Sequence, residues 1–172
     1  TVVLFLMHGS IFLLMKTEGV LQQQIRSWTK PLILAFIGCY LALTLSTFLT
    51  VPHLTESFLS RPFLYPVAFI NLLAIINIPR EMKRGRTLAA FLSSATAVLT
   101  LLLLFGVSAY PHLIYSHPFA AYSLTIYNAA SSAKTLRIML IIAACGLPLV
   151  LAYTTSIYWI FRGKVKLDEH SY

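Results

Sequence analysis

The sequence predicts an all-α, polytopic membrane helix bundle. Hydrophobic residues make up 58% of the chain, charged residues only 10%, and the mean hydropathy is +0.80. In soluble domains about a quarter of the residues are charged. Long apolar stretches alternate with short polar joins, which is the pattern of helices that cross a membrane repeatedly.

The first apolar stretch covers residues 1–15 and ends at Lys16, Thr17, Glu18 and Gly19. A hydrocarbon core about 30 Å thick needs roughly 20 helical residues, whereas 15 residues at about 1.5 Å each reach about 22 Å. We therefore expect a helix over residues 1–18 that is truncated at its N-terminal end, in a chain that begins inside an element of a larger protein. A charged segment and a cleavage site, as in a signal peptide, are not found here.

Four further stretches are long enough to be complete transmembrane helices, at residues 31–50, 62–78, 87–110 and 136–162. Pro31 and Pro62 are expected at helix starts, and Pro79 after a helix end, because proline lacks the N–H that a helix interior needs. The Gln-rich residues 19–30 suggest an interfacial continuation of the first helix. The whole chain, residues 1–172, is predicted to form a single transmembrane region.

The distribution of basic residues predicts the orientation. The joins on one side hold ten of them, against three on the other, which are Arg61, Lys134 and Arg137. By the positive-inside rule the first group is cytoplasmic, and so is the C-terminal tail with Asp168, Glu169 and His170. Because these charges form short clusters between apolar spans, anionic membrane lipids are the expected counterpart and nucleic acid is not.

His8 is the only histidine inside an apolar span. An ionisable group in the membrane is a functional candidate by default, so one hypothesis is a heme ligand or a proton relay. The alternative is structural: with Gly9 and Ser10 beside it, His8 hydrogen-bonds across a close contact between helices. No second span offers a histidine, which favours the structural role.

Lys16 and Glu18 are two positions apart and do not face each other on a helix, so we interpret them as anchors at the membrane interface. Asn71 lies near the bilayer centre, where an unpaired amide is costly. We expect it, like Asn77, to join helices through hydrogen bonds. The candidate partners on the next span are Ser93, Ser94 and Thr96. Close helix contacts are further expected at Gly9, Gly38 and Gly146.

Two features of the last span complete the set of candidate residues. Ser131 or Ser132 is the predicted N-cap of the final helix, whose start, near Arg137, is suited to an anion such as a lipid phosphate or an acidic group of a partner subunit. Pro148, after Gly146, predicts a kink. No metal-ligand spacing, nucleotide loop or catalytic triad is recognisable.

Several segments carry a family resemblance. His8-Gly9-Ser10 followed by Lys16-Thr17-Glu18-Gly19 resembles the "HGA…LKTEG" helix end of subunit II of the bacterial cytochrome bd ubiquinol oxidases. Residues 122–136, 146–150 and 158–166 resemble the closing stretch of that family in order and spacing. The resemblance covers essentially all of this chain but only about the C-terminal half of the family's subunit.

The resemblance implies an inner-membrane complex that oxidises quinol, reduces dioxygen to water and generates a proton gradient. In that family subunit I holds heme b and heme d as well as the quinol site, while subunit II binds no heme. This chain would then carry no catalytic residue, bind no cofactor and support the assembly of subunit I. Two rival hypotheses are a secondary transporter fragment with a site shaped by Pro148, and an electron-transfer subunit with His8 as an axial heme ligand.

Overall fold

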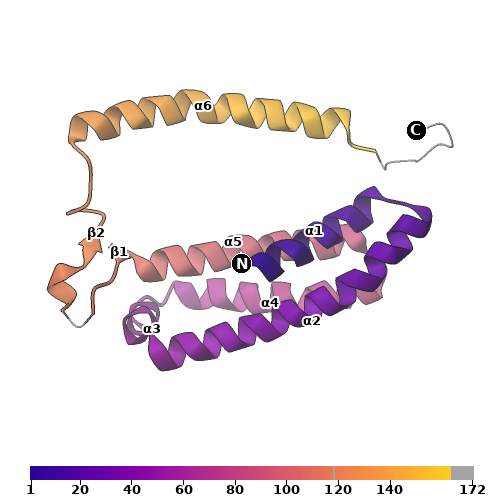
Figure 1. Ribbon diagram of the computed structural model, residues 1–172, viewed down its shortest axis with the longest axis horizontal. Helices are drawn as coiled ribbons and strands as arrows, with labels where there is room; N and C mark the ends of the chain where they lie inside the picture. Colours follow the sequence, from indigo (N-terminus) through magenta and orange to yellow (C-terminus); the bar gives the residue numbers. More distant parts are fainter. Residues whose placement is uncertain (118, 164–172) are drawn as a thin grey trace. The chain divides into compact units, whose positions relative to one another are not determined.

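The computed structural model describes residues 1–117 and 119–163 (Figure 1). The described part of the chain forms two compact units, Thr1–Ala109 and Tyr110–Gly163. The predicted cytoplasmic residues Lys164, Lys166, Asp168, Glu169 and His170 lie outside the described residues.

The first unit is a helical bundle. Its elements are α1 (Val2–Lys16), α2 (Gly19–Thr50), α3 (Pro52–Leu59), α4 (Leu64–Lys83) and α5 (Thr87–Ala109). Helix α1 packs against α2 and α5, and α4 packs along α5. The core between them is built mainly from isoleucine and alanine side chains, with one methionine and one phenylalanine: Met7, Ile11, Ile33, Phe36, Ala74, Ile75, Ile78, Ala90 and Ala97.

The second unit contains a short hairpin and a long helix. The hairpin pairs β1 (His112–Ile114) with β2 (Leu124–Thr125) in antiparallel fashion, with a 3-10 turn, η1 (Ala120–Tyr122), between the strands. Helix α6 (Ala133–Ile160) follows. Neither the hairpin nor α3 is predicted from the sequence, because both are too short for a periodic pattern to reveal them.

Three described helices, α2, α5 and α6, are long and apolar enough to cross a membrane, and α1 is a shorter apolar helix. This is the composition of a multi-pass membrane protein. Helix α4 has 20 residues but includes Asn71, Asn77, Arg80 and Glu81, which lower its hydropathy. The count of four complete spans therefore remains a prediction.

The prediction for residues 19–30 is wrong, because these residues form the start of α2 and not a continuation of α1. The chain breaks at Thr17, whose backbone is extended, and turns at Gly19, whose φ of +67° favours glycine. The Gln22 side chain then donates to the carbonyls of Leu14 (3.0 Å) and Thr17 (2.8 Å). These bonds satisfy the end of α1 that a helix otherwise leaves open.

Two prolines also differ from expectation. Pro31 lies inside α2, and Pro79 lies inside α4, which continues to Lys83. Membrane helices tolerate internal proline because neighbouring groups re-satisfy the freed backbone carbonyl. Pro148 likewise lies inside α6, which runs past it without interruption to Ile160.

The start of α6 confirms Ser132 as the N-cap. Its hydroxyl oxygen accepts from the backbone N–H of Thr135 at 3.3 Å and lies 2.9 Å from the Thr135 hydroxyl. Ser132→Ala should therefore destabilise the second unit by about 1 kcal/mol, measured as a lower unfolding temperature of the detergent-solubilised protein. Ser131→Ala is the matched control, and an equal loss in both variants would argue against a capping role.

Candidate functional site

The polar side chains inside the bundle meet on one helix. Helix α5 presents Ser93, Ser94 and Thr100 to its neighbours, and each hydroxyl is bonded to a side chain from α1 or α4. We call these three serine and threonine residues the α5 polar row.

His8 of α1 joins the row at Ser94. Its Nδ1 lies 2.7 Å from the Ser94 hydroxyl oxygen, and its ring stacks on Phe91 with centroids 4.8 Å apart. The Ser94 hydroxyl donates its one proton to the carbonyl of Phe91 at 2.8 Å, so its oxygen is left to accept from His8. We therefore assign the Nδ1–H tautomer to His8. The hydrogen bond across helices expected of a structural histidine is present.

Asn71 of α4 is completely buried and faces the other end of the row. Its Nδ2 donates to the Thr100 hydroxyl at 2.7 Å and to the carbonyl of Ala97 at 3.1 Å. Its Oδ1 has no hydrogen-bond partner among the described residues. Asn71 thus joins α4 to α5 as expected, but through Thr100 and Ala97 instead of the candidate partners Ser93, Ser94 and Thr96.

Asn77 of α4 meets the row at Ser93, with 2.9 Å between its Nδ2 and the hydroxyl oxygen. This pair confirms one of the candidate partners. Like Ser94, Ser93 gives its own proton to its helix, at the carbonyl of Ala89. The hydroxyls of the row are therefore acceptors toward α1 and α4, and the donors come from the facing helices.

Small side chains allow this close approach. Ala90, Ser94 and Ala97 of α5 are completely buried, and their spacing of four and three positions puts them on one face of the helix. The glycines that were predicted to lie at close helix contacts do not lie at such contacts within the described chain. A Cβ added at Gly9, Gly38 or Gly146 would meet no atom within 4 Å.

Lys16 and Glu18 lie at the corner between α1 and α2. Lys16 is the half-buried last residue of α1, and Glu18 is the exposed N-cap residue of α2, whose side chain makes no capping bond. Their place at a helix end suits the interfacial role expected of them.

Glu81 is a residue that the sequence reasoning passed over. It belongs to the buried face of α4, and its side chain is only 7% exposed. Its Oε1 lies 3.1 Å from an Arg84 nitrogen, and its Oε2 lies 3.9 Å from an Arg86 nitrogen. The available signal was a single carboxylate within a run of basic residues, three positions before Arg84.

The second unit holds its own polar cluster around Asn128. The Asn128 Oδ1 accepts from the N–H of Thr125 at 2.6 Å, and its Nδ2 donates to the carbonyl of Ser123 at 3.0 Å. Ser123 is buried, and its hydroxyl oxygen accepts from the N–H of Ser116 at 3.1 Å. These bonds shape the loop that leads to Ser132. Ser131 and Arg137 lie on either side of that cap and join none of these bonds.

Tyr110 and Tyr127 of the same unit share a hydrogen bond, with 2.5 Å between their hydroxyl oxygens. This bond, together with the charge that Tyr110 would carry when ionised, raises the pKa of Tyr127. The neutral form is favoured, so any stability from the pair is present below the ordinary tyrosine pKa and is lost as the pH rises through the raised one. Absorbance titration near 295 nm should show the pKa of Tyr127 falling in Tyr110→Phe and unchanged in Tyr122→Phe.

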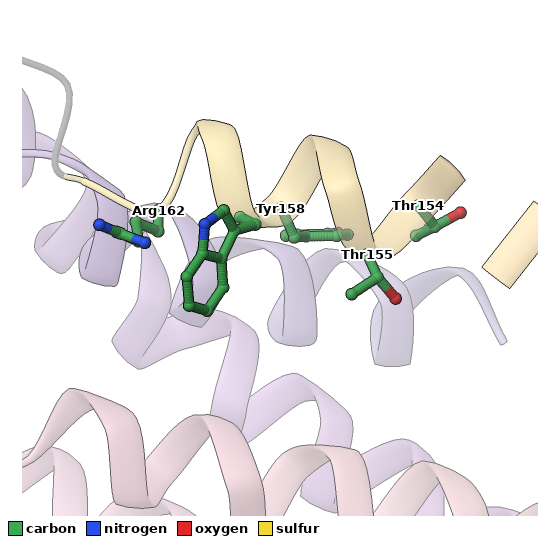
Figure 2. A pocket seen from close by; sticks show the side chains of 5 residues that line it. Thr154, Thr155, Tyr158 and Arg162 are labelled. Atoms are coloured by element: carbon green, nitrogen blue, oxygen red, sulfur yellow. The ribbon is translucent and has the colours of Figure 1, made fainter. Parts of the chain in front are cut away.

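The C-terminal part of α6 carries an open hollow lined by Thr154, Thr155, Tyr158, Trp159 and Arg162 (Figure 2). The guanidinium carbon of Arg162 lies 4.6 Å from the centre of the Trp159 ring, within range of a cation–π interaction. All five residues come from one helix and its end. We interpret the hollow as an unevenness of the helix surface and not as a binding site. Aromatic and basic residues such as these commonly contact lipid headgroups at the membrane interface.

The sequence of this chain is similar to that of known proteins. A profile of the family described as cytochrome bd terminal oxidase subunit II matches residues 1–161. The chain is 28% identical to cytochrome bd ubiquinol oxidase subunit 2 of Bacillus subtilis (strain 168), over 94% of this chain and 47% of that protein. It is 24% identical to cytochrome bd-I ubiquinol oxidase subunit 2 of Escherichia coli (strain K12), over 66% of this chain and 30% of that protein.

The chain therefore spans about half the length of the first of these relatives, or 47%. Nearly all of the described residues fall within the matched range, including His8, Asn71, Glu81 and the α5 polar row. The chain belongs to the cytochrome bd terminal oxidase subunit II family.

Proposed function

We propose that this chain is a structural part of the second subunit of a cytochrome bd-type quinol oxidase, and that it supports the heme-bearing subunit I. The observation that carries the proposal is the family match over residues 1–161. In the proposed complex, quinol is oxidised and dioxygen is reduced to water at sites outside this chain. Heme b and heme d belong to subunit I.

The contacts inside the bundle support a structural role. Asn71, Asn77 and His8, three polar residues of α1 and α4, are all bonded to α5. Interhelical hydrogen bonds of this kind hold membrane helices together where the hydrophobic effect gives little drive.

The surroundings of His8 support a packing role for this residue. His8 is the one histidine of α1, α2, α4, α5 and α6, whereas a six-coordinate heme needs a second axial side chain. Phe91 stacks on the imidazole ring, and Nδ1 is bonded to Ser94, so both contacts tie the His8 side chain to α5. We therefore propose that His8 is a packing residue in a chain that carries no cofactor.

We further propose a location in the bacterial plasma membrane with the C-terminus in the cytoplasm. The support is the excess of basic residues between Lys16 and Lys30, around the α4–α5 turn and after α6. Trp28 and Trp159 are both strongly exposed, as suits tryptophans at a membrane interface.

The test is to purify the full-length protein from membranes with whatever subunits accompany it, and to record a reduced-minus-oxidised spectrum. We expect a heme-bearing partner, and we expect His8→Ala to leave every heme signal in place while lowering the yield of complex. Ser94→Ala, which removes only the hydrogen-bond partner, is the matched control. A complex with no heme-bearing partner, or the loss of one heme signal in assembled His8→Ala, would overturn the proposal.

A further inference from the structure

The turn between α4 and α5 is the most basic part of the described chain. Arg80, Lys83, Arg84 and Arg86 fall within seven positions, with Glu81 as the one acidic residue among them. Arg80, Lys83 and Arg84 adjoin on the last turn of α4, since they are three and four positions apart. All four basic side chains are exposed. The turn thus carries a net three positive charges.

Glu81 organises two of these charges. Its buried carboxylate lies between Arg84, at 3.1 Å, and Arg86, at 3.9 Å, whose side chains are themselves 49% and 70% exposed. The backbone N–H of Arg86 also donates to the carbonyl of Glu81 at 3.0 Å. Gly85, with a φ of +72°, lets the chain reverse between the two arginines. Two guanidinium groups are therefore held beside each other at the end of the bundle.

An exposed apolar stripe leads up to this cluster. On α4, Leu72 and Ile76 precede Arg80 at intervals of four, and the C-cap residue Arg84 follows four positions later, so that successive members of this row adjoin along one side of the helix. Leu72 and Ile76 are both exposed, Ile76 by 64%. The same helix face thus changes from apolar to cationic as it reaches the end of α4.

We propose that this face binds one anionic phospholipid, whose headgroup phosphate meets Arg80, Arg84 and Arg86 while an acyl chain lies along Ile76 and Leu72. The planar guanidinium of arginine can donate two parallel hydrogen bonds to two oxygens of one phosphate. The apolar stripe beside the arginines favours a lipid over a free anion or an acidic protein segment as the ligand. The inference rests on the membrane location within the proposed function. It does not depend on which subunit carries the heme.

The test uses the full-length protein in its detergent-purified, delipidated complex, titrated with phosphatidylglycerol while thermal stability is monitored. In the double variant Arg84→Gln/Arg86→Gln, the phosphatidylglycerol concentration for half-maximal stabilisation should rise about 30-fold, since each basic residue near an anionic headgroup contributes about a factor of five. Arg84→Lys/Arg86→Lys keeps the charges and should shift it much less. Phosphatidylcholine and inorganic phosphate should stabilise the wild type weakly.

The matched control is Arg26→Gln/Lys30→Gln, which removes two exposed charges from the predicted cytoplasmic part of α2. An equal rise in the phosphatidylglycerol concentration for half-maximal stabilisation in this control would overturn the proposed site. Stabilisation of the wild type by inorganic phosphate at the same concentrations would also overturn it. Loss of a partner subunit with unchanged lipid binding would assign the turn to a protein contact instead.

Should Arg84→Gln/Arg86→Gln fail to assemble, Arg80→Gln/Lys83→Gln, which leaves the Glu81 contacts intact, must still weaken phosphatidylglycerol binding. The heme spectrum is read separately, so failure of the lipid site is distinguishable from failure of the oxidase assignment.

Discussion

Replacing Ala97 with leucine is expected to force α4 and α5 apart and to give the largest loss of stability of any single change considered. Ala97 is completely buried, and its carbonyl accepts from Asn71 at 3.1 Å. The added side chain has no space where a small residue lets two helices approach. Overpacking of this kind costs about 1–3 kcal/mol, and the Asn71 bond is lost with it. The measurement is the thermal unfolding of the purified full-length protein in detergent.

The matched control is Ala42→Leu, the same substitution at an exposed position of α2. It adds apolar surface toward lipid and should leave the unfolding temperature nearly unchanged. Equal behaviour of Ala97→Leu and Ala42→Leu would mean that α4 and α5 do not pack through the face that contains Ala97. A wild-type unfolding temperature in Ala97→Leu would mean the same.

The helices themselves follow from the apolar runs. The expected span at residues 87–110 is observed as α5, Thr87–Ala109, because both of its ends coincide with a change from apolar to polar sequence. The cap at Ser132 was also predictable, since the hydroxyl, its position and the following helix all point to it. Local signals of this kind need no knowledge of the tertiary structure.

Helix α2 shows where such signals fail. Its first part is Gln-rich and polar, and Pro31 looks like a helix start, so the sequence favours a boundary that does not exist. Proline is most frequent at the first turn of a helix, but this preference is weak beside the cost of breaking a helix in lipid. The break occurs instead at Thr17 and Gly19, where Gln22 satisfies the open carbonyls.

The partners of the buried asparagines were only partly predictable. Helices α4 and α5 form an antiparallel pair around Gly85, so residues equally far from Gly85 face each other. Asn77 and Ser93 are each eight positions away, and Asn71 and Thr100 are fourteen and fifteen. Once the turn is placed at Gly85, this register indicates Thr100 as the partner of Asn71. The contact of His8 with Ser94 joins helices far apart in sequence and has no such signal.

Replacing Asn71 with leucine is expected to weaken assembly of the proposed oxidase complex without altering heme ligation in the proposed partner subunit. The variant loses both donors that join α4 to Thr100 and Ala97, while leucine keeps much of the side-chain volume. Hydrogen bonds between membrane helices contribute on average about 0.6 kcal/mol and up to about 1.7 kcal/mol. Since Asn71 makes two, we expect a loss of about 1–2 kcal/mol, seen as a lower unfolding temperature and a smaller yield of assembled complex.

A double-mutant cycle separates this bond from the other effects of the substitution. Thr100→Val removes the hydroxyl acceptor at constant shape, and its effect should be smaller in the Asn71→Leu background than in the wild type. Additive losses would show that the pair is not coupled. Selective loss of one heme signal in an otherwise assembled Asn71→Leu complex would contradict the structural role, because Asn71 would then act on the cofactor and not on the packing of α4 against α5. If assembly falls while every remaining complex keeps its full spectrum, the α5 polar row acts as a device for joining helices.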